Sequence, residues 1–168
     1  MPQLIPRAEA LARIRGEGGE PSCLMCAIAQ GRVGPLLEVA SDGDVLLFLP
    51  RYVRRWGQLC AMPRTHVTSY SEWSHESSAA VHRVAHRAAV LLERLGRPRR
   101  VYLASTGSSA EELTQSSRHI HVHVIPNYDS EDRPASIFSW QEGVWVAEPE
   151  EWEQLRTTYV RAWADLGP

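Results

Sequence analysis

Three histidines alternate with apolar residues in the segment HIHVHVIP, residues 119–126. This pattern limits the possible local structure and chemistry more than any other feature of the sequence. Successive strand residues point to opposite faces, so His119, His121 and His123 would share one face and stand about 7 Å apart from one to the next. We expect the apolar residues between them to face the core and the histidines to lie on the exposed face. Neither packing nor strand propensity favours three aligned histidines, so the pattern indicates imidazole chemistry, with a solvated strand face as the alternative.

Hydrophobic patterning predicts a mixture of strands and helices around this segment. Short apolar runs bounded by Gly, Pro or charged residues predict strands at 45–49, 58–62 and 100–105, with another at 119–125. Apolar residues at helical spacing predict a long helix over 75–95 with Gly96 as its C-terminal cap. They also predict a C-terminal helix that begins at Pro149.

Length and composition favour one domain. With 168 residues, 43% of them hydrophobic, the chain is long enough for a single sizeable core. We place an N-terminal extension at residues 1–20, where a short helix over 6–15 would lie loosely on the surface. The compact domain would then occupy residues 21–168.

Charge and hydropathy exclude several classes of function. The net charge of -2 provides no global field for a nucleic acid polymer, so any bound phosphate must be held locally. The longest apolar run, 45–49, is far below the roughly 20 residues that span a bilayer, and residues 1–19 carry charges where a secretory signal would be apolar. We therefore expect a cytoplasmic protein with no membrane association.

The three cysteines are an odd number, which makes a disulfide scaffold a poor interpretation. Cys23 and Cys26 are spaced so that two thiolates can bind one ion from a tight turn. Two alternatives stay open: a redox pair, which normally follows a strand in a βαβ unit, and two unliganded cysteines on a helix. Cys60 lies within the apolar run 58–62 and is expected in the core.

Taken together, these motifs resemble those of bacterial histidine triad (HIT) proteins. The order and spacing match in four segments: CLMCAIAQG from Cys23, VLLFL from Val45, GQLCAMPRTH from Gly57 and QSSRHIHVHVIP from Gln115. The resemblance covers residues 23–126, whereas residues 127–168 match little. It implies an α+β, HIT-like fold in which an antiparallel sheet of about five strands carries one long helix and a C-terminal helix. It also implies a homodimer.

The resemblance implies a zinc site as well. Zinc-containing relatives hold the metal with the two cysteines of the CxxC motif, the histidine after the P-[KR]-x motif and the first histidine of the triad. In this chain the corresponding ligands are Cys23, Cys26, His66 and His119. Two thiolates and two imidazoles close a tetrahedron with no open position, so this zinc would be structural.

The same resemblance assigns the catalytic roles. His121, the middle histidine, would attack the α-phosphorus of a nucleotide and form a nucleotidyl-histidine intermediate. His123, Gln115 and Ser116 would surround the phosphorus oxygens or the leaving group, and Ser117 would belong to the same substrate-binding turn. A backbone carbonyl would orient the His121 ring, and the triad strand is its expected source.

The expected activity is hydrolysis of a nucleoside phosphoramidate or a dinucleoside polyphosphate, which releases a nucleoside monophosphate. Transfer of the same nucleotidyl group to phosphate or to a sugar phosphate is an alternative, as in related phosphorylases and uridylyltransferases. A nucleotide-binding regulator with little activity is a third interpretation, which the intact triad disfavours because a binder needs no unligated nucleophile. A cupin-like metal site on the histidines is a fourth, and it leaves the CxxC cysteines without a role.

Three positions depart from the family pattern. Pro50 follows VLLFL where many relatives have an aspartate that bonds the ribose, Gln58 replaces a frequent histidine, and Thr114 replaces a glycine. These changes indicate that the nucleotide, or the group attached to it, is not the commonest one.

A basic cluster lies next to the expected ribose side of the pocket and consists of Arg51, Arg54 and Arg55. It is either a solvated loop or a substrate-binding cluster that contacts a second phosphate or the leaving group. The second interpretation places substrate specificity beyond the α-phosphorus.

Overall fold

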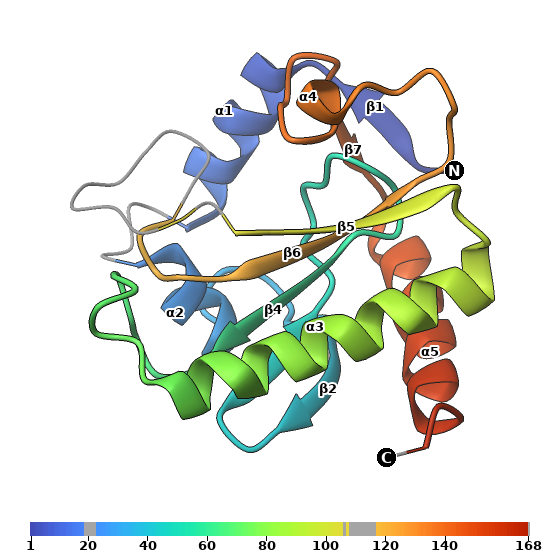
Figure 1. The fold of residues 1–168 in the computed structure, drawn as a ribbon. Helices are drawn as coiled ribbons and strands as arrows, with labels where there is room; N and C mark the ends of the chain where they lie inside the picture. Colours follow the sequence, from blue (N-terminus) through green and yellow to red (C-terminus); the bar gives the residue numbers. More distant parts are fainter. Residues whose placement is uncertain (19–22, 106, 108–116, 168) are drawn as a thin grey trace.

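A five-stranded antiparallel sheet forms the centre of the fold (Figure 1). The structure is a computed structural model that describes residues 1–18, 23–105, 107 and 117–167. The strands of the sheet are β2 (Glu38–Asp42), β3 (Val45–Phe48), β4 (Leu59–Pro63), β5 (Arg100–Ser105) and β6 (Val122–Asn127). They lie in the order β2, β3, β4, β6, β5, and each neighbouring pair is antiparallel. The predicted α+β fold around such a sheet is confirmed.

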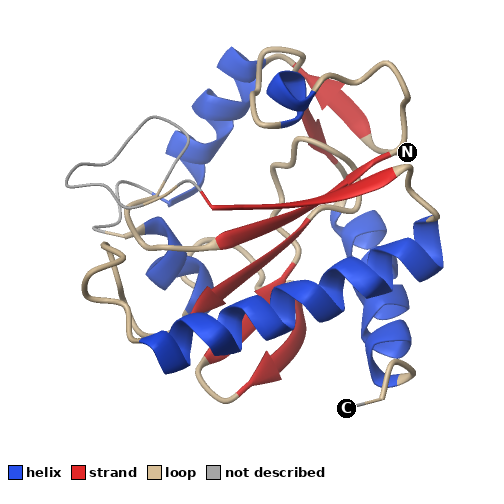
Figure 2. Ribbon diagram, in the orientation of Figure 1, coloured by secondary structure: helices blue, strands red, loops and turns tan. Residues whose placement is uncertain are grey.

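Alternation along the strands gives the sheet two apolar faces, each covered by helices. These helices are α2 (Leu24–Ala29), α3 (His75–Gly96) and α5 (Pro149–Ala164). On one face, Leu47 and Val124 belong to a core shared with α3 and α5, and Figure 2 shows the long helix α3 running across the strands. On the other face, Phe48 and Met62 pack against α2. His123 pairs in register with Cys60, a residue of this second face, so the triad opens on the α2 side.

The long helix α3 has the apolar stripe expected from its sequence. Its buried residues include Val81, Val84, Ala88, Leu91 and Leu92. The helix begins after Ser74, whose Oγ accepts a hydrogen bond from Ser77 N at 3.2 Å. The predicted cap at Gly96 is wrong, because Gly96 is still helical and Arg97 adopts the left-handed conformation with φ of 44°. A Cβ at Gly96 would lie 2.9 Å from the hydroxyl of Tyr128, so a larger residue here requires the Tyr128 side chain to shift.

The N-terminal segment packs against the C-terminal part of the chain, so the expectation of a loosely held helix is wrong. Its elements are β1 (Gln3–Ile5) and α1 (Arg7–Gly18), and its partners are α4 (Pro134–Ile137) and β7 (Val144–Val146). Strands β1 and β7 pair antiparallel at the top of Figure 1. Ile5 and Ala10 are buried with Trp140, which supplies the apolar surface that holds the segment. The division at residue 20 stays a prediction.

The C-terminal helix α5 begins at Pro149, as predicted. Glu151 Oε2 in its first turn accepts from Glu148 N at 3.2 Å, which satisfies a backbone donor at the helix start. Tyr159 Oη donates to the carbonyl of Gly57 at 3.0 Å and ties the helix to the loop before β4. Within the described part of the chain, no helix is long and apolar enough to cross a membrane.

Candidate functional site

The triad segment enters β6 at Val122, so the strand begins later than the one predicted over 119–125. A different backbone partner explains the shift, because Ile120 N donates to the carbonyl of Val67 at 2.8 Å, outside the sheet. The side-chain alternation is as predicted, since Ile120, Val122 and Val124 are all buried in the main core.

Two of the three histidines are buried, which corrects the expectation that all three line an exposed face. His119 is 0% exposed and His121 is 2% exposed, whereas His123 is partly exposed. The ring of His119 is enclosed because it lies against Cys26 and the carbonyl of Pro63. The solvated strand face, the alternative drawn from the sequence, is therefore wrong.

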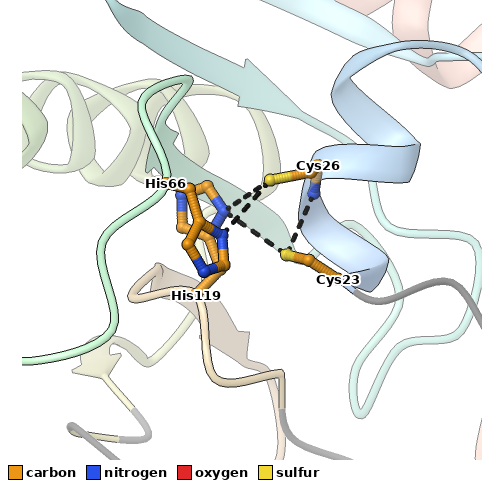
Figure 3. Close-up of side chains that lie close together, drawn as sticks. All are labelled: Cys23, Cys26, His66 and His119. Atoms are coloured by element: carbon orange, nitrogen blue, oxygen red, sulfur yellow. Dashed lines mark hydrogen bonds between the residues drawn. The ribbon is translucent and has the colours of Figure 1, made fainter.

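Three separate parts of the chain form a Cys/His cluster of Cys23, Cys26, His66 and His119 (Figure 3). Cys23 precedes α2 and Cys26 lies in its first turn, where Cys26 N donates to Cys23 Sγ at 3.4 Å. His66 follows β4, and His119 precedes β6. The four predicted ligands therefore converge, with their ligand atoms within 4.8 Å of one another.

Distances within the Cys/His cluster fit a tetrahedral zinc ion. Zinc bonds of about 2.3 Å to sulfur and about 2.0 Å to nitrogen place neighbouring S and N ligand atoms about 3.5 Å apart. Cys26 Sγ lies 3.3 Å from His66 Nδ1 and 3.5 Å from His119 Nδ1. Cys23 Sγ lies 3.7 Å from His119 Nδ1. Two sulfurs and two nitrogens at these separations are compatible with tetrahedral zinc coordination.

A backbone carbonyl fixes the orientation of the His119 ring. His119 Nε2 lies 2.9 Å from the carbonyl oxygen of Pro63, which can only accept, so Nε2 carries the proton and Nδ1 keeps its lone pair toward the cysteines. Burial, followed by the neighbouring His66, lowers the pKa of His119 to about 4 and keeps the ring neutral. Burial, followed by Cys23, raises the pKa of Cys26 to about 11, so a thiolate here needs the charge of a bound cation.

A second backbone carbonyl orients His121. His121 Nδ1 lies 2.8 Å from the carbonyl oxygen of His119, so Nδ1 carries the proton and the neutral ring has its lone pair on Nε2. That Nε2 faces His123 Nε2 at 3.1 Å, with the two ring planes 88° apart. Burial lowers the pKa of His121 and holds the pKa of His123 well below its ordinary value. The orienting carbonyl thus lies on the triad segment, where the sequence predicted it.

The segment before β4 adds two side chains to this histidine pair. Arg54 N donates to Gln58 Oε1 at 3.2 Å, and Gln58 Nε2 lies 3.0 Å from His123 Nδ1. Arg54 is only 8% exposed, and its Nη1 lies 3.5 Å from His123 Nε2. Burial lowers the pKa of this guanidinium, and its Nε has no hydrogen-bond partner among the described residues. A buried cation therefore stands beside His123.

The basic cluster is not one unit. Arg55 binds both carboxylate oxygens of Asp132, through Nη2 at 2.8 Å and Nε at 3.0 Å. Arg51 Nη2 donates to a backbone carbonyl at 3.1 Å, and its side chain lines a cavity of about 350 Å³ whose lining includes none of the triad histidines. Arg54 contacts the triad at His123, and because Arg54 is buried the solvated-loop interpretation is wrong for it.

The remaining predicted site residues lie N-terminal to the triad. Ser117 is buried beside the Cys/His cluster: its Oγ lies 3.9 Å from Cys23 Sγ and accepts from His119 N at 3.4 Å. Its contact with substrate stays a prediction. Gln115 and Ser116, as well as Thr114, lie outside the described residues.

Two residues at the site have partners that sequence reasoning missed. Gln58 enters the sequence interpretation only as a departure from the family pattern, and Cys60 only as a core residue. Cys60 is buried as expected, and burial raises its pKa. Its sulfur also lies within 4.8 Å of ring nitrogens of His121 and His123. Gln58 could have been noticed as a polar residue at the start of an apolar strand. Its contact with His123 could not be predicted, because that contact depends on the register of β4 with β6.

Comparisons with known proteins agree with this architecture. No protein-family model matches the chain. The sequence is 25% identical over 144 residues to the Bacillus subtilis (strain 168) protein called "Protein hit", covering 83% of this chain and 93% of that protein. The fold is similar to a Zn-bound histidine triad family protein from Mycobacterium smegmatis, at 23% identity and a TM-score of 0.67, covering 86% of this chain and 95% of that one. A hypothetical histidine triad nucleotide-binding protein from Sulfolobus tokodaii strain7 gives 23% identity and a TM-score of 0.66, covering 86% and 93%.

The sheet and the long helix have the arrangement of the histidine triad fold. The chain has the fold of the HIT superfamily, as its motifs led us to expect. Its Cys/His cluster is compatible with zinc, and the Mycobacterium smegmatis protein of the same fold is Zn-bound.

Proposed function

We propose that this protein is a nucleotide hydrolase that acts at the α-phosphorus of a nucleoside phosphoramidate or a dinucleoside polyphosphate. The observation that carries the proposal is the hydrogen bond from His121 Nδ1 to the carbonyl of His119, at 2.8 Å. It leaves the lone pair of His121 on Nε2, the atom that faces His123. A buried neutral imidazole with one fixed lone pair is suited to nucleophilic attack.

The reaction would proceed in two displacements. The Nε2 lone pair of His121 forms a bond to the α-phosphorus, and the bond from phosphorus to the leaving group breaks. His123 donates a hydrogen bond to a phosphorus oxygen or to the leaving group, as its position 3.1 Å from His121 Nε2 allows. The leaving group departs with the bonding electron pair and takes up a proton from solvent. Water then attacks the phosphorus of the nucleotidyl-histidine and gives a proton to solvent, and the bond from phosphorus to Nε2 breaks. The nucleoside monophosphate is released, and the electron pair returns to Nε2 and restores the neutral ring.

Arg54 would hold the phosphate. A buried guanidinium is costly when it is unpaired, and Arg54 Nε has no hydrogen-bond partner among the described residues. A phosphate oxygen near His123 would supply the missing negative charge and accept from the guanidinium. Gln115, Ser116 and Ser117 remain proposed contacts from the resemblance. Arg55 is a weaker candidate, because Asp132 already pairs with its charge.

The proposed cofactor is one structural zinc ion per chain, held by the Cys/His cluster. When bound, zinc would tie the start of α2 to the ends of β4 and β6 and supply no Lewis acid chemistry, because the four ligands close its coordination shell. His119 would thus serve two functions: its ring would bind zinc, and its backbone carbonyl orients the ring of His121.

Turnover of a donor panel tests the function. Purified protein is mixed with adenosine and guanosine phosphoramidates and dinucleoside polyphosphates, and the release of nucleoside monophosphate is measured. His121→Ala should abolish release, whereas His86→Ala, which removes an exposed histidine of α3, should leave it unchanged. Retained activity in His121→Ala, or no turnover of any donor, would remove the proposal. Addition of inorganic phosphate separates hydrolysis from the phosphorylase alternative, which would form a nucleoside diphosphate.

A further inference from the structure

We propose that Gln58 is a positioning residue that fixes the tautomer of His123, so that His123 presents Nε2–H to the lone pair of His121. The proposal deepens the proposed function and rests on it for its catalytic meaning. It depends on a chain of hydrogen bonds that runs between two backbone groups and whose direction is fixed at both ends.

The first fixed end is the backbone N–H of Arg54, which can only donate. It lies 3.2 Å from the oxygen of the Gln58 side-chain amide, and this contact requires an acceptor at that position. The amide orientation is therefore set by the backbone, although oxygen and nitrogen of an amide are otherwise hard to tell apart. Gln58 Nε2 must then face His123 Nδ1, at 3.0 Å, and donate to it.

The second fixed end is the carbonyl of His119, which can only accept. It requires the proton on Nδ1 of His121 and leaves the lone pair on Nε2. His123 accepts at Nδ1, so its neutral ring carries the proton on Nε2, 3.1 Å from that lone pair. Along this chain the two directions agree, because all four hydrogen bonds point from Arg54 N toward the carbonyl of His119. Nη1 of Arg54, which can only donate, lies 3.5 Å from His123 Nε2, too far for a strong competing hydrogen bond.

The neighbouring charge supports a neutral ring. Nη1 of Arg54 lies 3.5 Å from His123 Nε2, and a guanidinium at this distance opposes a second positive charge on the imidazole. In the other neutral tautomer, two lone pairs would face each other across the 3.1 Å between His121 and His123. Gln58 removes this repulsion because its amide donates to His123 and accepts from Arg54 at the same time.

The tautomer matters for the reaction. A phosphorus oxygen or a leaving group needs a hydrogen-bond donor, and Nε2–H of His123 is such a donor, whereas the opposite tautomer would present a lone pair to the same oxygen. Before substrate binds, Nε2–H caps the nucleophilic lone pair of His121. An incoming phosphate oxygen would take over this donor and free the lone pair for attack.

The same series of hydrogen bonds disfavours metal binding at Cys60, His121 and His123. These residues bring three possible ligand atoms within 4.8 Å. Only one lone pair lies between the two Nε2 atoms in the fixed tautomers, and the cation of Arg54 stands beside them. Metal binding is therefore expected at the Cys/His cluster alone.

Gln58→Glu tests the proposal, because it keeps the size of the side chain and replaces the donor with an acceptor. Its carboxylate can still accept from Arg54 N, but it requires the proton of His123 on Nδ1. Imidazole nitrogens of the zinc-loaded, ¹⁵N-labelled full chain are assigned by NMR. In the wild type, His123 should show a protonated Nε2 and an unprotonated Nδ1; in Gln58→Glu the two should exchange. Gln154→Glu, the same change on the exposed side of α5, should leave both signals unchanged.

Kinetics supply the second arm. Gln58→Glu should lower kcat by about 10²-fold with little change in KM and normal zinc content, the size expected when one positioned proton donor is lost. Gln58→Met, which removes donor and acceptor but keeps the volume, should give a mixture of tautomers and a smaller fall in kcat. A wild-type His123 protonated on Nδ1, or a His123 spectrum that Gln58→Glu leaves unchanged, would overturn the proposal. The NMR result needs no turnover, so an absence of nucleotide hydrolysis would refute the proposed function and leave the tautomer assignment standing.

Discussion

Removal of the zinc ion should lower the melting temperature of this protein strongly. The ion would connect Cys23 with His119, and 96 positions of sequence separate these two residues. In the chain-entropy model, a covalent link that closes a loop of that size stabilises the folded state by about 4.7 kcal/mol. For a domain of this length, about 1 kcal/mol shifts the melting temperature by roughly 2 to 4 °C. Loss of the link should therefore lower it by roughly 10 to 20 °C.

His66→Ala is the cleanest variant for this measurement. His66 is exposed, so its removal leaves no cavity in the core, whereas truncation of the fully buried His119 would cost packing as well. Melting is followed by circular dichroism with zinc and with a chelator, and metal content is measured by atomic emission. Chelation should destabilise the wild type and have little further effect on His66→Ala. A wild type that holds no zinc, or that melts at the same temperature after chelation, would refute the structural role.

Further predictions concern the site and the assembly. Arg54→Met should raise KM by roughly 10- to 100-fold, the loss expected for one charged hydrogen bond. The ligand-free variant should be no less stable than the wild type, because the substitution removes a buried cation that has no carboxylate partner among the described residues. An unchanged KM would contradict the phosphate contact. Arg55→Met should instead lower the melting temperature, since it leaves the carboxylate of Asp132 without its partner. His123→Ala should keep zinc bound and slow single-turnover chemistry by about 10²- to 10³-fold, as for loss of one oxyanion donor; zinc loss would contradict its assignment. Light scattering should give the mass of a homodimer, and a monomer at all concentrations would contradict that expectation.

Patterning alone predicts most of the sheet and the two main helices. Strand β5 matches its predicted range, and α5 begins at Pro149 as expected. Both predictions succeed because an element buried on one face has apolar residues at regular spacing in the sequence. Strands β1 and β7 were missed, since each has only three residues and their pairing joins the two ends of the chain. The local sequence of Gln3–Ile5 does not predict pairing with Val144–Val146.

The site divides in the same way. Convergence of the four Cys/His ligands follows from motif spacing and the resemblance, and the structure brings them together as expected. Burial of His121 was not predicted, because alternation says which residues share a face but not what covers that face. The different contacts of Arg54 and Arg55 were also not predicted. The two arginines are neighbours in sequence, yet Arg54 contacts His123, whereas Arg55 contacts Asp132, which lies 77 positions from it. Such contacts depend on the tertiary fold alone.

Mass spectrometry of the quenched reaction intermediate identifies the residue that bonds to phosphorus, which we propose is His121. Wild-type protein is mixed briefly with each donor, quenched in acid or in base, digested and mapped. We expect a nucleotidyl group on His121, on the peptide that also contains His119 and His123, and no such group in His121→Ala. Fragmentation should place it on the middle histidine, because Nε2 of His121 carries the free lone pair. A nucleotidyl group on any other residue, in protein that turns the donor over, would show that His121 is not the nucleophile.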